Sequence, residues 1–368
     1  MDRRAFVWGG LGVVAVSASG VAGWRAATGS MADYERYAAA LRRELPGTPE
    51  LLDLIRFATL APNGHNTQPW RFGIAENEIL IQPDRSRATP VVDPDDHHVF
   101  VGLGCAVETL RIAAEATGRP GEVAIGDDGT VHYVFATGAA RSSPLFAAIP
   151  RRQSTRADFD GRPVSPEGLK ALAKAAEIPG VTLTILTERP RIDRVRELVL
   201  AGNDTQMSDA AFLTELKHWL RFNPVVAMAQ GDGLFSAASG NPVLPSLLGG
   251  PAFDLFVTAK SERRRYARQI DSSAGIAIFT GDRADRAHWI AVGRACQRFA
   301  LSATALGLRS SFVNQPVEVP ALRSELAEIA GVNGKRPDLV MRFGYGPRLC
   351  GNSGPRAVRK GFGGPPPS

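Results

Sequence analysis

Residues 104–118 read GCAVETLRIAAEATG, and residues 293–307 read GRACQRFALSATALG. The two stretches align without a gap, begin and end on glycine, and are rich in alanine and other small residues. Small residues with a helical apolar period predict two closely packed helices, each ending at its final glycine. Similar sequence at two distant places in one chain indicates an internal duplication.

A second pair of similar segments precedes these two helices. Residues 48–62 and residues 165–179 both start with Thr or Ser followed by Pro and Glu, continue with a helical apolar period, and end at a proline. This order is typical of a capped helix with proline in its first turn. The two pairs together predict two halves built on one plan.

Short apolar runs between the helices predict β-strands, so the expected fold class is α+β. Most of these runs are rich in β-branched or aromatic residues, and turn residues separate the members of each expected hairpin. The expected strands are 70–74 with 79–81, 123–125 with 131–135, and 181–186, 275–280 and 339–343.

The composition is that of a globular protein. Of the 368 residues, 44% are hydrophobic and 22% charged, which is enough to bury a core. The net charge is +6, but the arginines are spread along the chain, so no nucleic-acid partner is expected. Cys105, Cys296 and Cys350 lack the C-x-x-C spacing of a zinc site, and we expect Cys105 and Cys296 to be buried thiols.

The N-terminus resembles an export signal. Arg3 and Arg4 precede an apolar run from Val7 to Ala22, which is shorter than the roughly 20 residues of a membrane span. Paired arginines before such a run are typical of a twin-arginine signal. We therefore expect residues 1–30 to direct export to the periplasm or another extracytoplasmic location, as a cleaved signal or a retained membrane anchor.

The remaining chain is long enough for two halves of ordinary domain size. We expect the first half at residues 31–140 and the second at residues 141–368. Residues 231–251, GDGLFSAASGNPVLPSLLGGP, have no periodicity and interrupt the predicted helices. Such a stretch predicts a lid-like insertion in the second half.

Two polar motifs stand out, one in each half. Residues 61–72, APNGHNTQPWRF, place polar side chains between two prolines, which gives a stiff loop suited to hydrogen-bonding a planar heterocycle. Residues 151–156, RRQSTR, supply three guanidinium groups and two hydroxyls. Arginines at i and i+4 that flank a hydroxyl are suited to binding a phosphate monoester.

These motifs resemble those of the flavin-dependent nitroreductase family, and most closely its Acg-like branch of duplicated, often exported members. The family has R-x-S-x-R/K near the start of a protomer, a P-S-x-x-N-x-Q-P-W loop after its first helix, an alanine-rich helix closing on a glycine, and a late G-Y-G-P turn. The matching residues here are 152–156 (RQSTR), 62–70 (PNGHNTQPW), the helix ending at Gly307, and 344–347 (GYGP).

The resemblance implies a nitroreductase-like fold duplicated in one chain, with two sheets flanked by helices in an intertwined pseudo-dimer. Family members are typically homodimers that bind FMN between subunits, with the arginine motif from one subunit and the loop from the other. This chain has one copy of each motif, in opposite halves. We therefore expect a monomer with one complete FMN site and one degenerate site.

On this resemblance, Arg152, Ser154 and Arg156 would hold the FMN phosphate and ribityl chain. Arg156 would also lie near the N1 edge of the flavin, where positive charge stabilises the reduced anion. A late arginine often completes the phosphate site, and Arg356 or Arg359 is the candidate here.

The loop of the first half would line the isoalloxazine ring. The family usually has Ser where this chain has Asn63 and Gly64, while Gln68 and Trp70 are expected to be structural. The expected ring-lining residues are Pro62, Asn63, Gly64 and Asn66.

The function implied is that of an FMN-dependent oxidoreductase that transfers hydride through FMN to a nitro, quinone or similar acceptor. The electron donor would be NADH or NADPH, and no side chain is expected to be catalytic. One alternative is a protein that sequesters FMN under a lid and has no nitroreductase turnover. Another is an FMN-dependent oxidase or desaturase acting on a specialised metabolite.

Two features look catalytic or metal-binding but have simpler interpretations. Residues 93–98, DPDDHH, resemble metal ligands, yet acids and histidines before a helix are typical of a cap that favours the helix dipole. No metal site is expected. His65 is expected to orient its loop rather than act as an acid.

Overall fold

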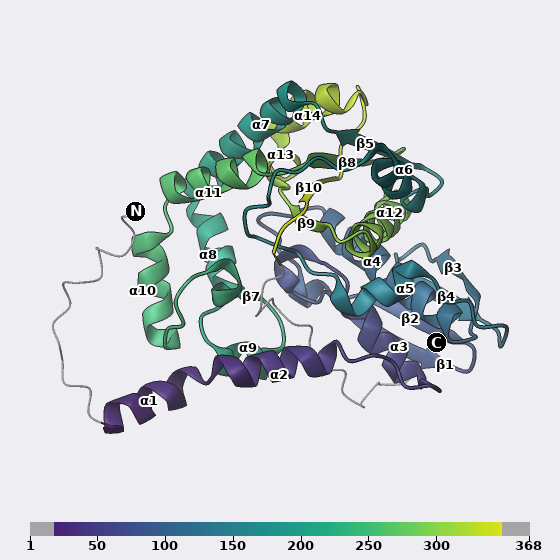
Figure 1. The fold of residues 1–368 in the computed structure, drawn as a ribbon, viewed down its shortest axis with the longest axis horizontal. Helices are drawn as coiled ribbons and strands as arrows, with labels where there is room; N and C mark the ends of the chain where they lie inside the picture. Colours follow the sequence, from purple (N-terminus) through teal and green to yellow (C-terminus); the bar gives the residue numbers. More distant parts are fainter. Residues whose placement is uncertain (1–17, 348–368) are drawn as a thin grey trace.

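The structure is a computed structural model and describes residues 18–347. Two four-stranded antiparallel sheets, one from each half of the chain, lie on opposite sides of a pair of long helices (Figure 1). Each long helix packs on the sheet of its own half, and the two helices pack against each other. The class is α+β, as predicted.

The first sheet has the strand order β1-β2-β4-β3, and all its pairs are antiparallel. One helix precedes it and a second helix connects β2 to β3. Both predicted hairpins are confirmed. The elements are α3 (Leu51–Ala58), β1 (Trp70–Ala75), β2 (Glu78–Pro83), α4 (His97–Ala116), β3 (Gly121–Ile125) and β4 (Val131–Phe135).

The second sheet has the order β5-β8-β10-β9, again antiparallel throughout. If the strands of each sheet are numbered along the chain, both sheets have the order first, second, fourth, third. A long helix connects the second strand to the third in both, so the predicted duplication is confirmed. The elements are α6 (Pro166–Ala175), β5 (Val181–Leu186), β8 (Gly275–Gly281), α12 (Arg286–Ala305), β9 (Arg309–Phe312) and β10 (Leu339–Gly344).

The two halves share one hydrophobic core. Phe57 and Ile79 of the first half belong to the same buried cluster as Phe279 and Phe343 of the second. Apolar burial is the main favourable term in folding, so this shared cluster holds the halves together. They are therefore not independent domains.

A buried ion cluster also joins the halves. Glu108 of α4 is fully buried, and its carboxylate contacts Arg111 of its own helix and both Arg294 and Arg298 of α12. Burial alone would raise the pKa of Glu108, but these guanidinium groups hold it below its usual value. The ionised carboxylate thus links α4 to α12.

The connection from β5 to β8, residues 187–274, is the largest difference between the halves, since the first sheet has only the turn 76–77 there. We call residues 187–274 the excursion. It contains α7 (Arg189–Ser208), α8 (Ala210–His218), β6 (Leu220–Arg221), α9 (Pro224–Gln230), β7 (Leu234–Phe235), α10 (Ser246–Phe256) and α11 (Ala259–Asp271), and β6 pairs with β7 in parallel.

The expectation that residues 231–251 are irregular was wrong at their C-terminal end, where α10 begins at Ser246. The sequence did not predict this helix because it contains glycines and Pro251, which are poor helix formers in isolation. Gly249 packs against the Phe222 ring, and a Cβ there would lie 2.2 Å from that ring. A tertiary contact therefore explains the glycine.

Two N-terminal helices pack against the excursion (Figure 1). They are α1 (Ala18–Thr28) and α2 (Met31–Leu41). Tyr34 of α2 forms a small buried cluster with Ala227 and Phe235, and its ring centroid lies 4.3 Å from that of Phe235. The N-terminal helices thus support the segment that follows α9.

The remaining helices are short and lie in connections. They are α5 (Pro144–Ala148), α13 (Gln315–Glu318), α14 (Arg323–Ala330), η2 (Gly64–Asn66), η3 (Arg85–Arg87), η4 (Ile149–Arg151), η5 (Ser236–Ser239) and η6 (Pro320–Leu322). None of the helices in residues 18–347 has the length and apolar character needed to cross a membrane.

Candidate functional site

A cavity of about 970 Å³ lies between the two halves and the excursion. It brings the two polar motifs together, although they belong to opposite halves of the chain. Arg356 and Arg359 lie outside the described residues. The predicted site residues that line the cavity are Pro62, Asn63, Gly64, Asn66, Arg152, Ser154 and Arg156.

The loop of the first half has an unusual backbone. His65, Asn66 and Gln68 have φ values of +46°, +54° and +58°, in the left-handed region that non-glycine residues rarely adopt. Hydrogen bonds hold the loop: the Gln68 amide donates to Asn63 Oδ1 at 2.9 Å, and Gln68 Nε2 donates to Asn66 Oδ1 at 2.8 Å. Such conformations persist where surrounding structure fixes them, and they cluster at functional sites.

His65 lies at the centre of this loop with its ring partly buried. Burial, together with the positive charges of Arg156 and His98, lowers the pKa of His65 to about 4. Its Nδ1 is buried and makes no hydrogen bond with residues 18–347. The ring is therefore neutral near pH 7.

The arginine motif lies against the end of α3. Arg152 is only 6% exposed and donates from Nη2 to the Leu60 carbonyl at 2.9 Å. Arg42, at the end of α2, donates to the carbonyls of Pro150 and Arg152 and so fixes the start of the motif. Burial lowers the pKa of Arg152 and of Arg156. Neither guanidinium forms an ion pair with an acid among the described residues.

Sequence reasoning missed Arg342 of β10, which is fully buried. Its guanidinium donates to the carbonyls of Thr155 and Ala157 at 2.8 Å and lies 4.1 Å from the centre of the Phe159 ring. Burial lowers the pKa of Arg342 to about 9. Its side chain thus holds the backbone on both sides of Arg156. The signal available in the sequence was an arginine within an otherwise apolar strand.

The sequence profile of the nitroreductase family matches residues 149–345, more than half of the chain. The protein belongs to the nitroreductase family. The match covers the arginine motif and β10, and it ends within the G-Y-G-P turn. The family resemblance expected from the motifs is thereby confirmed.

Relatives from Mycobacterium tuberculosis match more than four fifths of this chain. A Mycobacterium tuberculosis protein named "Putative NAD(P)H nitroreductase" is 27% identical over 321 residues, which is 84% of this chain and 89% of the relative. Another from that organism, "Putative NAD(P)H nitroreductase acg", is 23% identical over 323 residues, covering 83% and 93%. Among solved structures, the FMN-dependent nitroreductase of Mycobacterium smegmatis in complex with NADPH is 16% identical with a TM-score of 0.39, covering 59% of this chain and 94% of that one.

In this protein the excursion is hydrogen-bonded to the polar loop of the first half, residues 61–72, which we call the site loop. Asn66 and Gly233 form a reciprocal pair, in which Asn66 Nδ2 donates to the Gly233 carbonyl and the Gly233 amide donates to the Asn66 carbonyl, both at 2.9 Å. Next to them, Asp232 pairs with Arg87 of the first half and with Arg221 of the excursion. All three side chains are largely buried. These contacts fasten the excursion over the cavity.

The excursion also adds a charged pair to the cavity wall. Glu262 and Arg265 of α11 line the cavity and form an ion pair with each other. Burial raises the pKa of Glu262, and Arg265 opposes that rise. Like Arg342, this pair gave no motif that could be recognised from the sequence.

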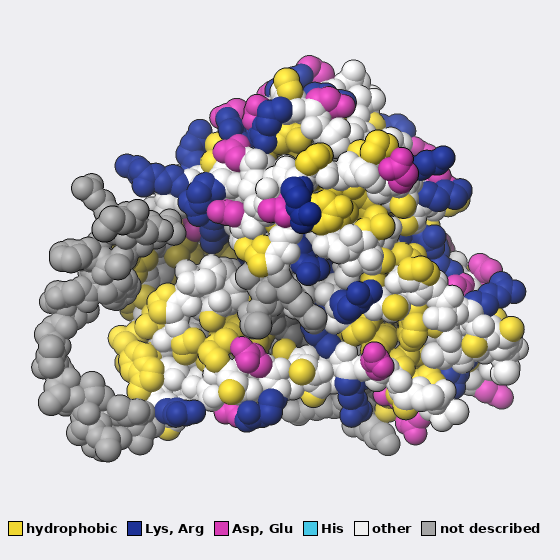
Figure 2. Space-filling model, in the orientation of Figure 1, with side chains coloured by type: hydrophobic (Ala, Val, Ile, Leu, Met, Phe, Trp, Pro, Cys, Tyr) yellow, Lys and Arg dark blue, Asp and Glu magenta, His cyan; other side chains and the backbone are white. Residues whose placement is uncertain are grey.

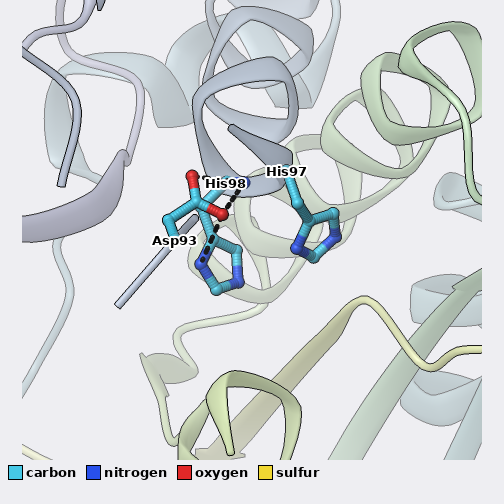
Figure 3. Close-up of side chains that lie close together, drawn as sticks. All are labelled: Asp93, His97 and His98. Atoms are coloured by element: carbon cyan, nitrogen blue, oxygen red, sulfur yellow. Dashed lines mark hydrogen bonds and ion pairs between the residues drawn. The ribbon is translucent and has the colours of Figure 1, made fainter. Parts of the chain in front are cut away.

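The cluster of Asp93, His97 and His98 at the start of α4 is arranged as a helix cap (Figure 3). The Asp93 carboxylate accepts hydrogen bonds from the backbone amides of His98 and Val99. Nε2 of His97 lies 2.9 Å from Oδ1 of Asp338. The three side chains are close enough for a shared ion, and the oxygens of Asp93 also accept the backbone bonds of the cap. This capping arrangement is the one predicted.

Proposed function

We propose that the protein is an FMN-dependent oxidoreductase of nitroreductase type, related to the Acg-like proteins. The observation that supports this most is the pair Arg152 and Arg156, which line the cavity and form no ion pair with an acid among the described residues, although the charge of Glu262 acts on Arg156. A buried cation is costly unless an anion compensates it. A phosphate monoester in this cavity would be that anion.

The residues present fit FMN. Arg152 and Arg156 would bind the phosphate with charge-assisted hydrogen bonds, and Ser154 would bind the phosphate or the ribityl chain. The loop lined by Pro62, Asn63, Gly64 and Asn66 would contact the ring system. FMN, when bound, supplies the hydride transfer. Arg342 would act indirectly, because it holds the backbone that carries Arg156.

The proposed donor is NADH or NADPH, and the proposed acceptor is a nitro compound, a quinone or a similar molecule. The names of the relatives and the NADPH of the M. smegmatis structure support a nicotinamide donor. The test is a purified chain mixed with FMN and then, without oxygen, with NADH or NADPH. Flavin absorbance that appears with the protein and bleaches with the donor is expected. Protein that retains no flavin would refute the proposal.

A second candidate function is FMN sequestration without turnover. The contacts of Asn66 with Gly233 and of Asp232 with Arg87 favour it, because they close the excursion over the loop that would contact the flavin. In the same experiment, bound flavin that neither NADH nor NADPH bleaches would support this function instead.

The arrangement also supports one FMN site per monomer. The arginine motif occurs once, in the second half, and the N-x-Q-P-W loop once, in the first. The shared core of the two halves supports a monomer that takes the place of the family dimer. A sedimentation measurement that gives a dimer would contradict this proposal.

We further propose that residues 1–30 direct export by the twin-arginine route. The proposal rests on Arg3 and Arg4 before the apolar run, most of which lies outside the described residues. Fractionation of cells expressing the full chain should recover it outside the cytoplasm. Arg3→Lys with Arg4→Lys should keep it inside, and export of that variant would contradict the proposal.

A further inference from the structure

The cavity extends to an apolar mouth formed by α10 and α1. Leu248 and Leu255 of α10 and Trp24 of α1 line the cavity, yet they are 48%, 70% and 47% exposed. Figure 2 shows apolar side chains gathered on this side of the molecule, over the region of α10 in Figure 1. Soluble proteins rarely expose several large apolar side chains together unless the patch binds something.

The apolar surface continues from this mouth into the cavity. Phe253 of α10 lines the cavity and is only 8% exposed, so one helix contributes both buried and exposed apolar lining. Met207, Phe212 and Leu216 of α7 and α8 add further apolar lining. A ligand that follows this surface would have hydrocarbon along part of its length.

The cavity wall also has hydrogen-bonding groups outside the arginine motif. Gln206 of α7 and Glu318 of α13 both line it, and Gln206 Nε2 donates to Glu318 Oε2 at 2.6 Å. Burial raises the pKa of Glu318, while the charge of His98 opposes that rise. The amide of Gln315 lines the same wall and its Oε1 is buried. The amide N–H groups of Gln206 and Gln315 can donate hydrogen bonds to the oxygens of a carbonyl or nitro head.

The size of the cavity leaves room for a second molecule beside a flavin. Its volume, about 970 Å³, is at the upper end of the roughly 300–1,000 Å³ of small-molecule sites. A flavin held by the arginine motif and the site loop would leave the apolar lining of α8 and α10 to another ligand.

We propose that this ligand is the electron acceptor, a molecule with a neutral quinone or nitroaromatic head and a hydrocarbon tail that leaves the cavity between Leu248, Leu255 and Trp24. The inference rests on the proposed function, because the head must reach the flavin. A quinone head would gain a hydride equivalent from NADH or NADPH by way of the flavin and a proton from solvent. The products are a hydroquinone and the oxidised nicotinamide.

The test compares two benzoquinones that share one head and carry either a methyl group or a decyl chain. Isothermal titration calorimetry would measure the affinity of both, with the full chain prepared with and without FMN. The decyl compound should bind at least about 30-fold more tightly, since each buried methylene strengthens binding roughly fourfold and burial of two to three of them is enough. Equal affinities would overturn the proposal.

Two variants of α10 test where the hydrocarbon tail binds. Leu248→Ser with Leu255→Ser should lose most of the preference for the decyl compound. Leu247→Ser is the matched control, because Leu247 is 86% exposed on the same helix but does not line the cavity. It should keep the preference. If Leu247→Ser loses as much, the proposal is overturned, and α10 is instead a surface for a membrane or a second copy.

The outcomes also separate this inference from the proposed function. If the protein binds no FMN, the proposed function fails, while the preference for the tail is still measured without flavin. If FMN binds and is bleached by the donor but the two quinones bind equally, the proposed function stands and only the tailed acceptor is refuted.

Discussion

Gly104 of α4 and Gly293 of α12 meet where the two helices cross, and a Cβ added to either would lie within 3.0 Å of the Cα of the other. The same added Cβ on Gly104 would lie 2.1 Å from the Ile290 carbonyl oxygen, and one on Gly293 would lie 2.0 Å from that of Val101. Ile290 and Val101 stand at the same distance before their glycines in the repeat alignment. Contacts that are equal in both directions are those of a twofold interface. The crossing therefore has the geometry of an interface between two subunits.

Gly104→Ala should destabilise the fold, because its methyl group would collide with a backbone carbonyl that cannot move aside. The expected loss in the free energy of unfolding is about 3 kcal/mol, the upper part of the range for overpacked sites. Thermal unfolding of both proteins would measure it. Gly250→Ala in α10 is the control, since a Cβ there meets nothing within 4 Å. An unchanged midpoint for Gly104→Ala would contradict the close crossing.

Arg152→Ala combined with Arg156→Ala should abolish FMN binding, because each hydrogen bond to a charged group contributes about 1.5–3 kcal/mol. Quenching of FMN fluorescence on titration with protein would measure the affinity. Arg151→Ala is the matched control, since that side chain is exposed and donates to the Ala147 carbonyl. It should bind FMN as the unmodified protein does.

The same titration on the unmodified protein should saturate near one FMN per chain. Two tight sites would contradict the assignment of the second site as degenerate.

Asp232→Asn should loosen the excursion over the cavity, because Asp232 pairs with both Arg87 and Arg221 in a largely buried position. Removing one partner from a buried ion pair costs about 3–5 kcal/mol. We expect a lower unfolding midpoint, faster release of bound FMN, and faster bleaching by NADH or NADPH. Stopped-flow absorbance would follow the last two.

Asp254→Asn is the control for that variant, since Asp254 pairs with Lys217 on the exposed surface of the excursion. It should leave flavin release unchanged. Equal release rates in Asp232→Asn and the unmodified protein would show that the contacts of Asp232 do not close the site.

His65 should make the protein less stable in acid. Its pKa is about 4 in the folded protein, against about 6.5 for an unperturbed histidine. Between these values the unfolded chain binds a proton that the folded chain does not, so stability falls as the pH falls through this window. The loss approaches about 3 kcal/mol at the acid end.

His65→Asn should remove this part of the acid sensitivity, because asparagine does not titrate and tolerates a positive φ. Unfolding midpoints across the same pH window would test it. His218→Asn, at the exposed end of α8, should keep the acid sensitivity of the unmodified protein. If His65→Asn shows the same slope, His65 does not cause the loss.

The strands, the paired helices and the two motifs could all be predicted from short stretches of the sequence. Alternating apolar residues, turn residues and caps act over a few positions, so the hairpin 70–81 and the helix ending at Gly307 could be predicted locally. The repeat of residues 104–118 at 293–307 gave the duplication. The two motifs indicated the family, and each could be recognised from the sequence because it spans few residues.

The way these parts meet depends on contacts that form only in the folded protein. Three features depend on residues that lie far apart in the chain. Arg342 donates hydrogen bonds to the backbone on both sides of Arg156, Asn66 bonds to Gly233, and α10 begins where Gly249 packs on a distant ring. A buried arginine is stable only because several distant carbonyls converge on it, and a glycine in a helix is explained only by the ring that packs against it. Such contacts cannot be predicted from local sequence patterns.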